Sequence, residues 1–573
     1  MNTPPARVQP VSSIAGPWLL FVVFFAGAAL MAYEIVGSRL LAPTFGSSTF
    51  VWGSLIAVFL GALAIGYTIG GRIADRRPTA GMLGMLLATA ALLVCVSVLL
   101  ADPLQEWIVD VGFGVRLNPL IASVLLFGPA SILMGMVSPY AVRLRAGDIE
   151  RVGATAGALY GLSTAGSIVG TLAASFWLVQ DFGSDATVVA VGLTLAACAL
   201  VAGWAGRASP LVLGYAVMAA VLVGVLAGSG VTGDQEGDTF RSSGSGFSPV
   251  FHAGGYEPQF EPNEGGKLRA SADSSYHRIR VVDYAAGQIG DAPARVLHFD
   301  NSLQAAAPLV GGKPQVTGAP LFGYLRAVDL APAIRPDAER ALLIGLGSGA
   351  AAMRLHELRP ELDIDVVELD PKVVEFAREW FGYEDSENGN PRITTHVGDG
   401  RTWLSAQDED VQFDIVAVDA YFADSIPFHL TTREFLELVR DHLVSDGIVS
   451  ANLIGAVEGD RSELLRAMHR TWSDVFPDLV MYPVPSPGEP AALDRFINVE
   501  FFAADQSGVL PPRGGERTLV EQADMAVDAD EILDDRFTEL LAARYIDEVS
   551  HRGVDVLTDD LAPVDSLLDV EGI

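Results

Sequence analysis

A glycine-rich segment followed by an acidic residue carries the clearest chemical signal in this sequence. The apolar run 341–344 leads into Gly345-Leu346-Gly347-Ser348-Gly349, and a helical pattern follows over residues 350–358. Glycines here permit a tight turn and the close approach of a ligand, and the start of the following helix offers free N–H groups. Glu368 follows about 20 residues later, where a carboxylate can accept hydrogen bonds from both hydroxyls of a ribose. This order predicts a nucleoside-binding site.

The glycine turn alone leaves the nucleoside open. Gly345, Gly347 and Ala350 also satisfy the dinucleotide fingerprint, so NAD, an adenosyl compound and a purely structural turn all remain. Two later acids favour the adenosyl compound. Asp399 stands between Gly398 and Gly400, where it can accept a hydrogen bond from an adenine amino group, and Asp419 closes the next apolar run.

Alternating strand and helix patterns must position these residues. They predict a doubly wound, Rossmann-like α/β sheet of the S-adenosylmethionine-dependent methyltransferase type, whose ligands lie at the C-terminal ends of the strands. Glu368, Asp399 and Asp419 all fall at such ends, so we expect one shared site. The alternating segments 275–282 and 295–299 predict a small antiparallel β cap before this sheet. The expected strands are 341–344, 365–370, 392–397, 413–418, 447–454, 478–484 and 495–504, and the later helices are 432–443 and 461–475.

The first 230 residues have a different composition. They contain seven apolar stretches, each long enough to cross a bilayer, which takes about 20 residues. These predict an all-α membrane half of about seven transmembrane helices, a multi-pass location in the cell membrane and the lipid bilayer as a partner. The stretches are residues 18–41, 51–71, 80–101, 119–142, 153–180, 186–206 and 209–229.

Loop charges give these spans an orientation. Arginines follow the second, fourth and sixth stretches, which puts the N-terminus inside and, with seven spans, the C-terminal half outside. An adenosyl cofactor is expected in the cytoplasm, so a re-entrant segment in place of one span is the alternative, and the side stays open.

These patterns divide the chain into five predicted parts. They are a transmembrane domain over 1–229, a flexible linker rich in Gly, Ser and Pro over 230–272, a β cap over 273–335, the adenosyl-binding domain over 336–510, and a C-terminal tail over 511–573 that packs on this domain.

Net charge excludes one class of partner. The chain carries −33, and nearly all of the acidic excess lies after residue 230. Such a surface repels phosphates, so we expect no binding of nucleic acid. The two cysteines, Cys95 and Cys198, both lie in apolar runs, and we expect neither a disulfide framework nor a metal site.

The order of motifs resembles the spermidine synthase (polyamine aminopropyltransferase) family. The resemblance covers roughly residues 272–505 and rests on 276–279, 297–300 with Gln304, the glycine turn, Glu368, Gly398-Asp399-Gly400 and Asp419. The whole architecture, with segments 424–431 and 557–564, is similar to the membrane-fused branch of that family.

The resemblance implies an activity and residue roles. The donor is decarboxylated S-adenosylmethionine, used as a co-substrate without a metal, and the acceptor is a small diamine such as putrescine. Asp419 positions the attacking amine and helps to take its proton. The implied donor-binding residues are His277, Gly345, Gly347, Ser348, Gly349, Glu368, Asp399 and Gly400, and those implied around the amine are Gln304, Tyr324, Tyr421, Asp424 and Pro427. A homo-oligomer is a further expectation.

Two other functions remain open from the sequence. Ser348 stands where the family usually has an aspartate that meets the aminopropyl ammonium group, so ordinary S-adenosylmethionine and a methyltransferase activity are an alternative. A transporter or sensor with a regulatory adenosyl-binding domain is the second alternative.

Overall fold

The computed structural model divides the chain into two compact units, Met1–Gly233 with Asp273–Ser275, and Asp234–Ala272 with Tyr276–Ile573. Each unit is described by itself. The structure describes residues 16–45, 49–111, 113, 117–145, 152–228, 239–240, 265–290, 292–300, 302–318, 320–420, 427–485, 490–523, 525–562 and 564.

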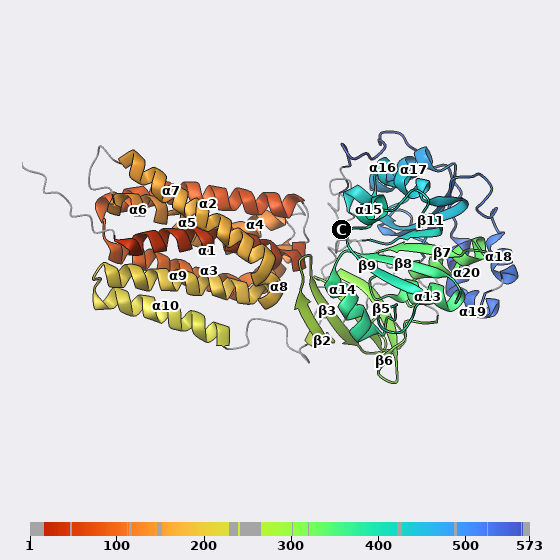
Figure 1. The fold of residues 1–573 in the computed structure, drawn as a ribbon, viewed down its shortest axis with the longest axis horizontal. Coiled ribbons are helices and arrows are strands. Elements are labelled where there is room, and N and C mark those ends of the chain that lie inside the picture. Colours follow the sequence, from red (N-terminus) through yellow and green to blue (C-terminus); the bar gives the residue numbers. More distant parts are fainter. Residues whose placement is uncertain are drawn as a thin grey trace, which may run out of the picture. The chain divides into compact units, whose positions relative to one another are not determined.

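The first unit consists of helices (Figure 1). All seven apolar stretches predicted as spans are helical, because apolar residues without strong turn signals favour a fully hydrogen-bonded helix. The helices are α1 (Pro17–Phe45), α2 (Thr49–Arg76), α3 (Ala80–Val111), α4 (Leu117–Leu126), α5 (Gly128–Gly135), α6 (Val137–Arg145), α7 (Val152–Ala173), a π-helical turn (Ala174–Leu178), α8 (Val179–Phe182), α9 (Ser184–Ala205) and α10 (Pro210–Gly228).

The count of spans differs from the prediction at two places. Within the described residues, five helices are long and apolar enough to cross a membrane, or six if one bent pair forms a single span. The bend is 53° between Leu117–Leu126 and Gly128–Arg145, where Pro129 begins α5 and removes a helical N–H. The seventh stretch corresponds to α10, whose apolar part, Pro210–Val225, is shorter than a usual span of about 20 residues.

Small residues set the packing of α1 against α7. A Cβ added at Gly166 would collide with the carbonyl oxygen of Phe24, and one at Gly170 would collide with that of Ala28. Glycine therefore lets the two backbones touch, which is how apolar helices associate where water gives no hydrophobic drive between them.

The second unit contains two sheets (Figure 1). The smaller one is ordered β1-β2-β3-β4-β5-β6, and β3, β4 and β5 pair antiparallel, as expected for the cap. Strand β2 covers the end of the segment predicted as a linker, where Leu268 and Ala270 alternate with polar residues. The bounds are β1 (Thr239–Phe240), β2 (Gly266–Asp273), β3 (Arg278–Tyr284), β4 (Ala294–Phe299), β5 (Ser302–Val310) and β6 (Lys313–Pro314).

The larger sheet has seven strands in the order β12-β13-β11-β10-β7-β8-β9. Strands β7 to β11 are parallel, and β13 runs antiparallel between β11 and β12. This confirms the predicted Rossmann-like sheet of the methyltransferase type. The strands are β7 (Arg340–Ile344), β8 (Asp363–Glu368), β9 (Ile393–Val397), β10 (Phe413–Val418), β11 (Leu443–Gly455), β12 (Asp478–Pro483) and β13 (Ile497–Ala504).

Helices cover both faces of this sheet. One face packs on apolar side chains of α15 (Gly400–Ser405), α16 (Arg433–Asp441) and α17 (Glu463–Val475). The other face packs on α13 (Ala350–Leu358), α14 (Pro371–Phe376), the 3-10 helix Tyr324–Asp329 and α12 (Ala331–Ile334). Three helices of the C-terminal tail complete this second core: α18 (Glu516–Gln522), α19 (Ala529–Ile532) and α20 (Asp535–Ala542).

The strand order places a topological switch point between β7 and β10. The chain leaves β7 toward β8 on one side, whereas it leaves β10 toward β11 on the other. Connections that diverge in this way open a crevice at the carboxyl ends of the two strands, where ligands of open α/β sheets bind.

Candidate active site

The glycine turn joins β7 to α13 in backbone conformations that favour glycine. Gly345, Gly347 and Gly349 all have positive φ, at 104°, 56° and 82°. A Cβ at Gly345 would collide with the carbonyl oxygen of Asp419, and one at Gly349 would collide with the ring of Tyr383. The turn therefore holds the ends of β7 and β10 in contact.

Ser348 points a hydroxyl into this turn. The residue is 1 % exposed, and its Oγ has no hydrogen-bond partner within the described part of the chain. Ser348 lines the cavity between the two sheets, as do Gly345 and Gly347. Gly349 does not line this cavity; it caps α13 and faces Tyr383. An unpaired buried hydroxyl beside a cavity is suited to a polar ligand.

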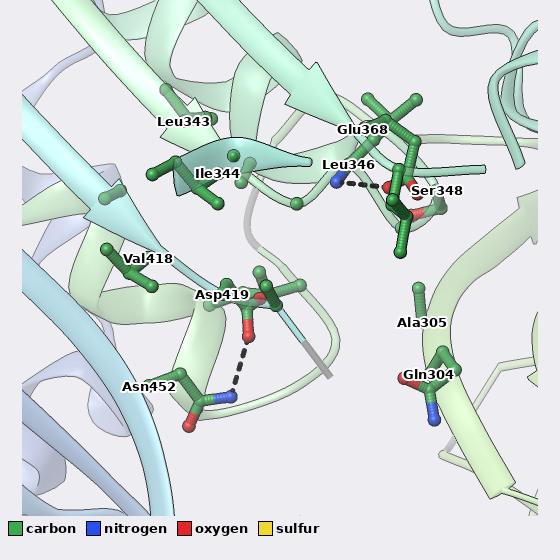
Figure 2. A pocket seen from close by; sticks show the side chains of 18 of the residues that line it. Gln304, Ala305, Leu343, Ile344, Leu346, Ser348, Glu368, Val418, Asp419 and Asn452 are labelled. Atoms are coloured by element: carbon green, nitrogen blue, oxygen red, sulfur yellow. Dashed lines mark hydrogen bonds between the residues drawn. The ribbon is translucent and has the colours of Figure 1, made fainter. Parts of the chain in front are cut away.

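Glu368 ends β8 directly beside the turn (Figure 2). Its two carboxylate oxygens accept hydrogen bonds from the backbone N–H groups of Leu346, at 3.0 Å, and Asp370, at 2.9 Å. Burial raises the pKa of Glu368 to about 7, against the lowering effect of these hydrogen bonds. The carboxylate is therefore fixed toward the cavity, in the place expected for an acceptor of ribose hydroxyls.

Asp399 forms the N-cap of α15. Its Oδ1 accepts hydrogen bonds from the backbone N–H and the hydroxyl of Thr402, both at 2.8 Å, and its Oδ2 lies 2.7 Å from Nε2 of His429. Burial opposes ionisation, but the hydrogen bonds from Thr402 and His429 lower the pKa of Asp399 below its usual value. A Cβ added at Gly400 would collide with the side chain of Ile344, so the start of α15 lies against the end of β7.

The C-terminal tail supports this corner of the site. Asp559 accepts two hydrogen bonds from the guanidinium of Arg401, at 2.7 and 2.6 Å, and one from the hydroxyl of Thr432, at 2.8 Å. Arg401 in turn donates to the carbonyl oxygen of His429 at 2.9 Å. The tail motif 557–564 thus fixes His429, which is the hydrogen-bond partner of Asp399.

Asp419 follows β10 and lines the same cavity next to the glycine turn (Figure 2). Its Oδ1 accepts a hydrogen bond of 3.0 Å from the side-chain amide of Asn452 on β11. Burial raises the pKa of Asp419 to about 6, and the bond from Asn452 works against this rise. A carboxylate with this pKa is ionised at neutral pH and close enough to neutrality to accept a proton.

The cap supplies the remaining wall. Tyr324 donates a hydrogen bond of 3.0 Å to the carbonyl oxygen of Gln304 on β5, and both residues line the cavity. His277 stacks on Phe299, with ring centroids 4.9 Å apart, and its Nδ1 lies 3.3 Å from the carboxylate of Asp300. Figure 2 shows Gln304 on the far side of the cavity from Asp419.

Most predicted site residues come together around this one cavity. Tyr421 and Asp424 lie outside the described residues, and Gly349 acts on the turn without lining the cavity. The predicted residues that line it are His277, Gln304, Tyr324, Gly345, Gly347, Ser348, Glu368, Asp399, Gly400, Asp419 and Pro427.

Sequence patterns missed several polar residues of the cavity. Asn452 on β11 and Asn498 and Glu500 on β13 line it, and so do Tyr276, Asp370 and His429. A weak signal existed for the strand residues, because Asn452 and Glu500 interrupt otherwise apolar runs. Their side chains share a wall with Asp419 only through the pairing of β10, β11 and β13, which no local pattern reveals.

The fold and cavity define a class of protein, a Rossmann-like domain with an acidic cavity at its switch point. Residues 326–494 match the family model of the spermine/spermidine synthase domain.

Two curated relatives are similar to part of this chain. The chain is 32% identical over 255 residues to a probable polyamine aminopropyl transferase of Bifidobacterium longum. This match covers 43% of this chain and 52% of that protein. It is 33% identical over 165 residues to a polyamine aminopropyltransferase of Vibrio vulnificus, covering 29% and 52%. The chain therefore spans about half the length of these curated relatives. Among solved structures, a probable spermidine synthase from Corynebacterium glutamicum aligns with 51% of this chain and 97% of its own, with a TM-score of 0.38 and 17% identity.

Proposed function

We propose that this chain is a polyamine aminopropyltransferase that moves an aminopropyl group from decarboxylated S-adenosylmethionine to a diamine such as putrescine. One observation supports this most directly. Asp419, held by Asn452, lines the same cavity as the glycine turn and Glu368, so a candidate base and the candidate nucleoside site share one space. The domain match over 326–494 supports the same reaction class.

The nucleoside side of the cavity fits an adenosyl donor. Glu368 is held by two backbone N–H groups and can accept from ribose hydroxyls, while Asp399 can accept from the adenine amino group. Close approach of the ligand to the turn needs glycine at 345 and 347, and the unpaired hydroxyl of Ser348 supplies one more polar contact. His277 and Gly400 complete this side, and Gly349 acts by shaping the turn.

The acceptor side suits a cationic amine. In the transfer, the lone pair of a neutral amine nitrogen forms a bond to the carbon beside the sulfonium, the carbon–sulfur bond breaks, and its electron pair goes to sulfur. The new ammonium group then loses a proton, which Asp419 is suited to take. Tyr324, Gln304 and Pro427 shape the space around the amine, and Tyr421 and Asp424 are proposed to take part from the adjoining loop. Holding both reactants in one cavity supplies much of the rate without a covalent intermediate.

The helical unit is proposed to anchor the enzyme as a multi-pass protein of the cell membrane. Five of its described helices have the length and apolar composition to cross a bilayer. Which side of the membrane carries the second unit, and whether the chain forms a homo-oligomer, stay predictions.

Comparing two donors tests the proposal. Full-length protein purified in detergent is incubated with putrescine and either decarboxylated or ordinary S-adenosylmethionine, and products are identified by mass spectrometry. We expect an aminopropylated amine with the first donor and no methylated amine with the second. Methyl transfer from the ordinary donor would favour the methyltransferase alternative, and binding of donor without any transfer would favour a regulatory role.

A further inference from the structure

Glu500 is a buried acid that has no role in the reaction proposed above. It lies in the middle of β13, is 4 % exposed and lines the cavity. Its Oε1 has no hydrogen-bond partner among the described residues. Burying a carboxyl group without a partner costs stability, so the position is better explained by a ligand than by packing.

Strand pairing puts Glu500 in one row with Asp419. Val418 pairs with Ala451 on the parallel strands β10 and β11, so the residues that follow them, Asp419 and Asn452, are level. Asn452 is directly opposite Glu500 on β13. Neighbouring strands are about 4.8 Å apart, so the backbones of the two acids are separated by about 10 Å, with Asn452 between them.

The cavity around this row is strongly acidic. Besides Glu500, its lining includes the carboxyl groups of Glu368, Asp370, Asp399 and Asp419. None of the described lining residues is Lys or Arg, and the two histidines, His277 and His429, lie beside Asp300 and Asp399. A cationic ligand that enters the cavity therefore meets an excess of acids that no described Lys or Arg of the lining neutralises.

Polar but uncharged groups otherwise surround Glu500. Tyr324 approaches from the 3-10 helix, and burial raises the pKa of its phenol, as do the nearby carboxyl groups of Asp419 and Glu500. Tyr482 on β12 is directly opposite Glu500, but its hydroxyl donates to Glu516. Asn498 precedes Glu500 by two residues and lies on the same face of β13. These neighbours leave the carboxyl group of Glu500 available to a ligand.

We propose that Glu500 binds the second ammonium group of the acceptor, so that the substrate is a diamine or longer polyamine with its reacting nitrogen at Asp419 and its other nitrogen at Glu500. This inference rests on the proposed function and deepens it, because it names the group that selects diamines over monoamines. Two carboxyl groups separated by two strands match two cationic nitrogens separated by a short aliphatic chain.

Proton release is a signature of this arrangement. Burial and the negative charge of Asp419 raise the pKa of Glu500 well above its usual value, so the carboxyl group of the free site binds a proton more readily than an exposed glutamate does. An ammonium group placed beside Glu500 stabilises its ionised form, and the proton leaves to solvent. A diamine therefore releases this proton on binding, whereas a monoamine that reaches only Asp419 does not.

Glu500→Gln tests the assignment, because it removes the charge and keeps the shape. We compare putrescine with butylamine, a monoamine of equal chain length, on full-length protein. The expected result is a rise of about tenfold or more in KM for putrescine, a smaller change in kcat, and unchanged kinetics with butylamine and unchanged donor affinity. Glu500→Asp, which keeps the charge, should retain most of the preference for the diamine. Glu458→Gln, an exposed acid after β11, is the control and should behave as the wild type.

Equal losses with putrescine and butylamine would overturn the assignment, and so would an unchanged preference in Glu500→Gln. If the wild-type chain transfers no aminopropyl group, the proposed function fails, but amine binding still tests Glu500. Calorimetric titration should then show putrescine binding about tenfold or more tightly than butylamine, with proton release, and Glu500→Gln should abolish the difference. Equal binding of the two amines by the wild type would contradict the inference.

Discussion

Three acidic side chains at strand ends have three different environments. Burial raises the pKa of Glu368 and Asp419, whereas hydrogen bonds from Thr402 and His429 lower that of Asp399. Asp399 therefore stays ionised, Glu368 is an acceptor fixed by two backbone N–H groups, and Asp419 has a pKa of about 6 at the end of β10, next to the glycine turn. These differences in pKa and hydrogen bonding distinguish three acids that the sequence pattern predicted only as members of one shared site.

Asp419→Asn should lower turnover about tenfold or more and leave donor affinity near normal, because the amide cannot take a proton. Steady-state kinetics and donor titration on full-length protein measure the two effects. Asp410→Asn, an exposed acid before β10, serves as the control. A fully active Asp419→Asn variant would remove Asp419 from catalysis.

Activity should also fall on the acidic side with the titration of Asp419. Its folded-state pKa is about 6, so the carboxylate is protonated below this pH and can no longer accept a proton from the amine. We expect the titration of Asp419 to add an acidic limb to kcat/KM that falls up to tenfold per pH unit below about 6. A pH profile that is flat between about pH 5 and about pH 8 would contradict this assignment, because this range extends about one unit or more on either side of the pKa. An acidic limb that persists unchanged in Asp419→Asn would contradict it as well.

Glu368→Gln should weaken donor binding about tenfold or more, since hydrogen bonds to a charged acceptor are stronger than those to an amide. Equilibrium titration of the donor measures the change, and Glu375→Gln, a half-exposed acid on α14, is the matched control. Unchanged donor affinity in Glu368→Gln would exclude Glu368 from the nucleoside site.

Strand ends and the turn between them were predictable, because their signals are local. The run before Gly345, the helix after it and the acids at 368, 399 and 419 all depend on neighbours in sequence. The antiparallel position of β13 between β11 and β12 depends on pairing between distant segments, so Asn452, Asn498 and Glu500 escaped notice. The bend before α5 was equally hidden in an apolar stretch that contains Pro119, Pro129 and Pro139, of which Pro129 lies at the break.

The turn gives a stability prediction with an internal control. Gly345→Ala combines a positive φ with a collision against the backbone of β10, whereas Gly347→Ala meets only Ala305, at 3.8 Å. We expect a loss of about 1–2 kcal/mol for Gly347→Ala from backbone strain alone and a clearly larger loss for Gly345→Ala. Thermal unfolding of the full-length variants checks the order. Equal losses at the two positions would show that the contact between β7 and β10 is not rigid.

Composition divides the molecule into two units of different solvent preference. The acidic excess lies after residue 230, while helices of the first unit expose large apolar side chains. On α7 and the π-helical turn, Ile168, Phe176 and Trp177 are 57 %, 61 % and 60 % exposed. Surfaces of this kind are stable in lipid and not in water. Length and hydropathy predict the apolar character of the first unit, whereas its described helices include five, or up to six, able to cross a membrane in place of the seven predicted.

Membrane fractionation tests the proposed anchoring. The full-length chain should stay with the membrane pellet after high-salt and alkaline washes and enter solution only with detergent, because apolar burial is insensitive to both washes. Release of the chain by salt alone would indicate a peripheral association and contradict the multi-pass proposal.

The most direct test of the central claim follows one labelled group. Decarboxylated S-adenosylmethionine labelled in its aminopropyl chain is mixed with putrescine and full-length protein, and the label is traced by mass spectrometry. We predict that the label appears in the aminopropylated amine, with an equal amount of the neutral thioether nucleoside, and that Asp419→Asn slows this transfer. If the label stays in unreacted, tightly bound donor after an incubation much longer than the turnover time of a typical enzyme, aminopropyl transfer by this protein is contradicted.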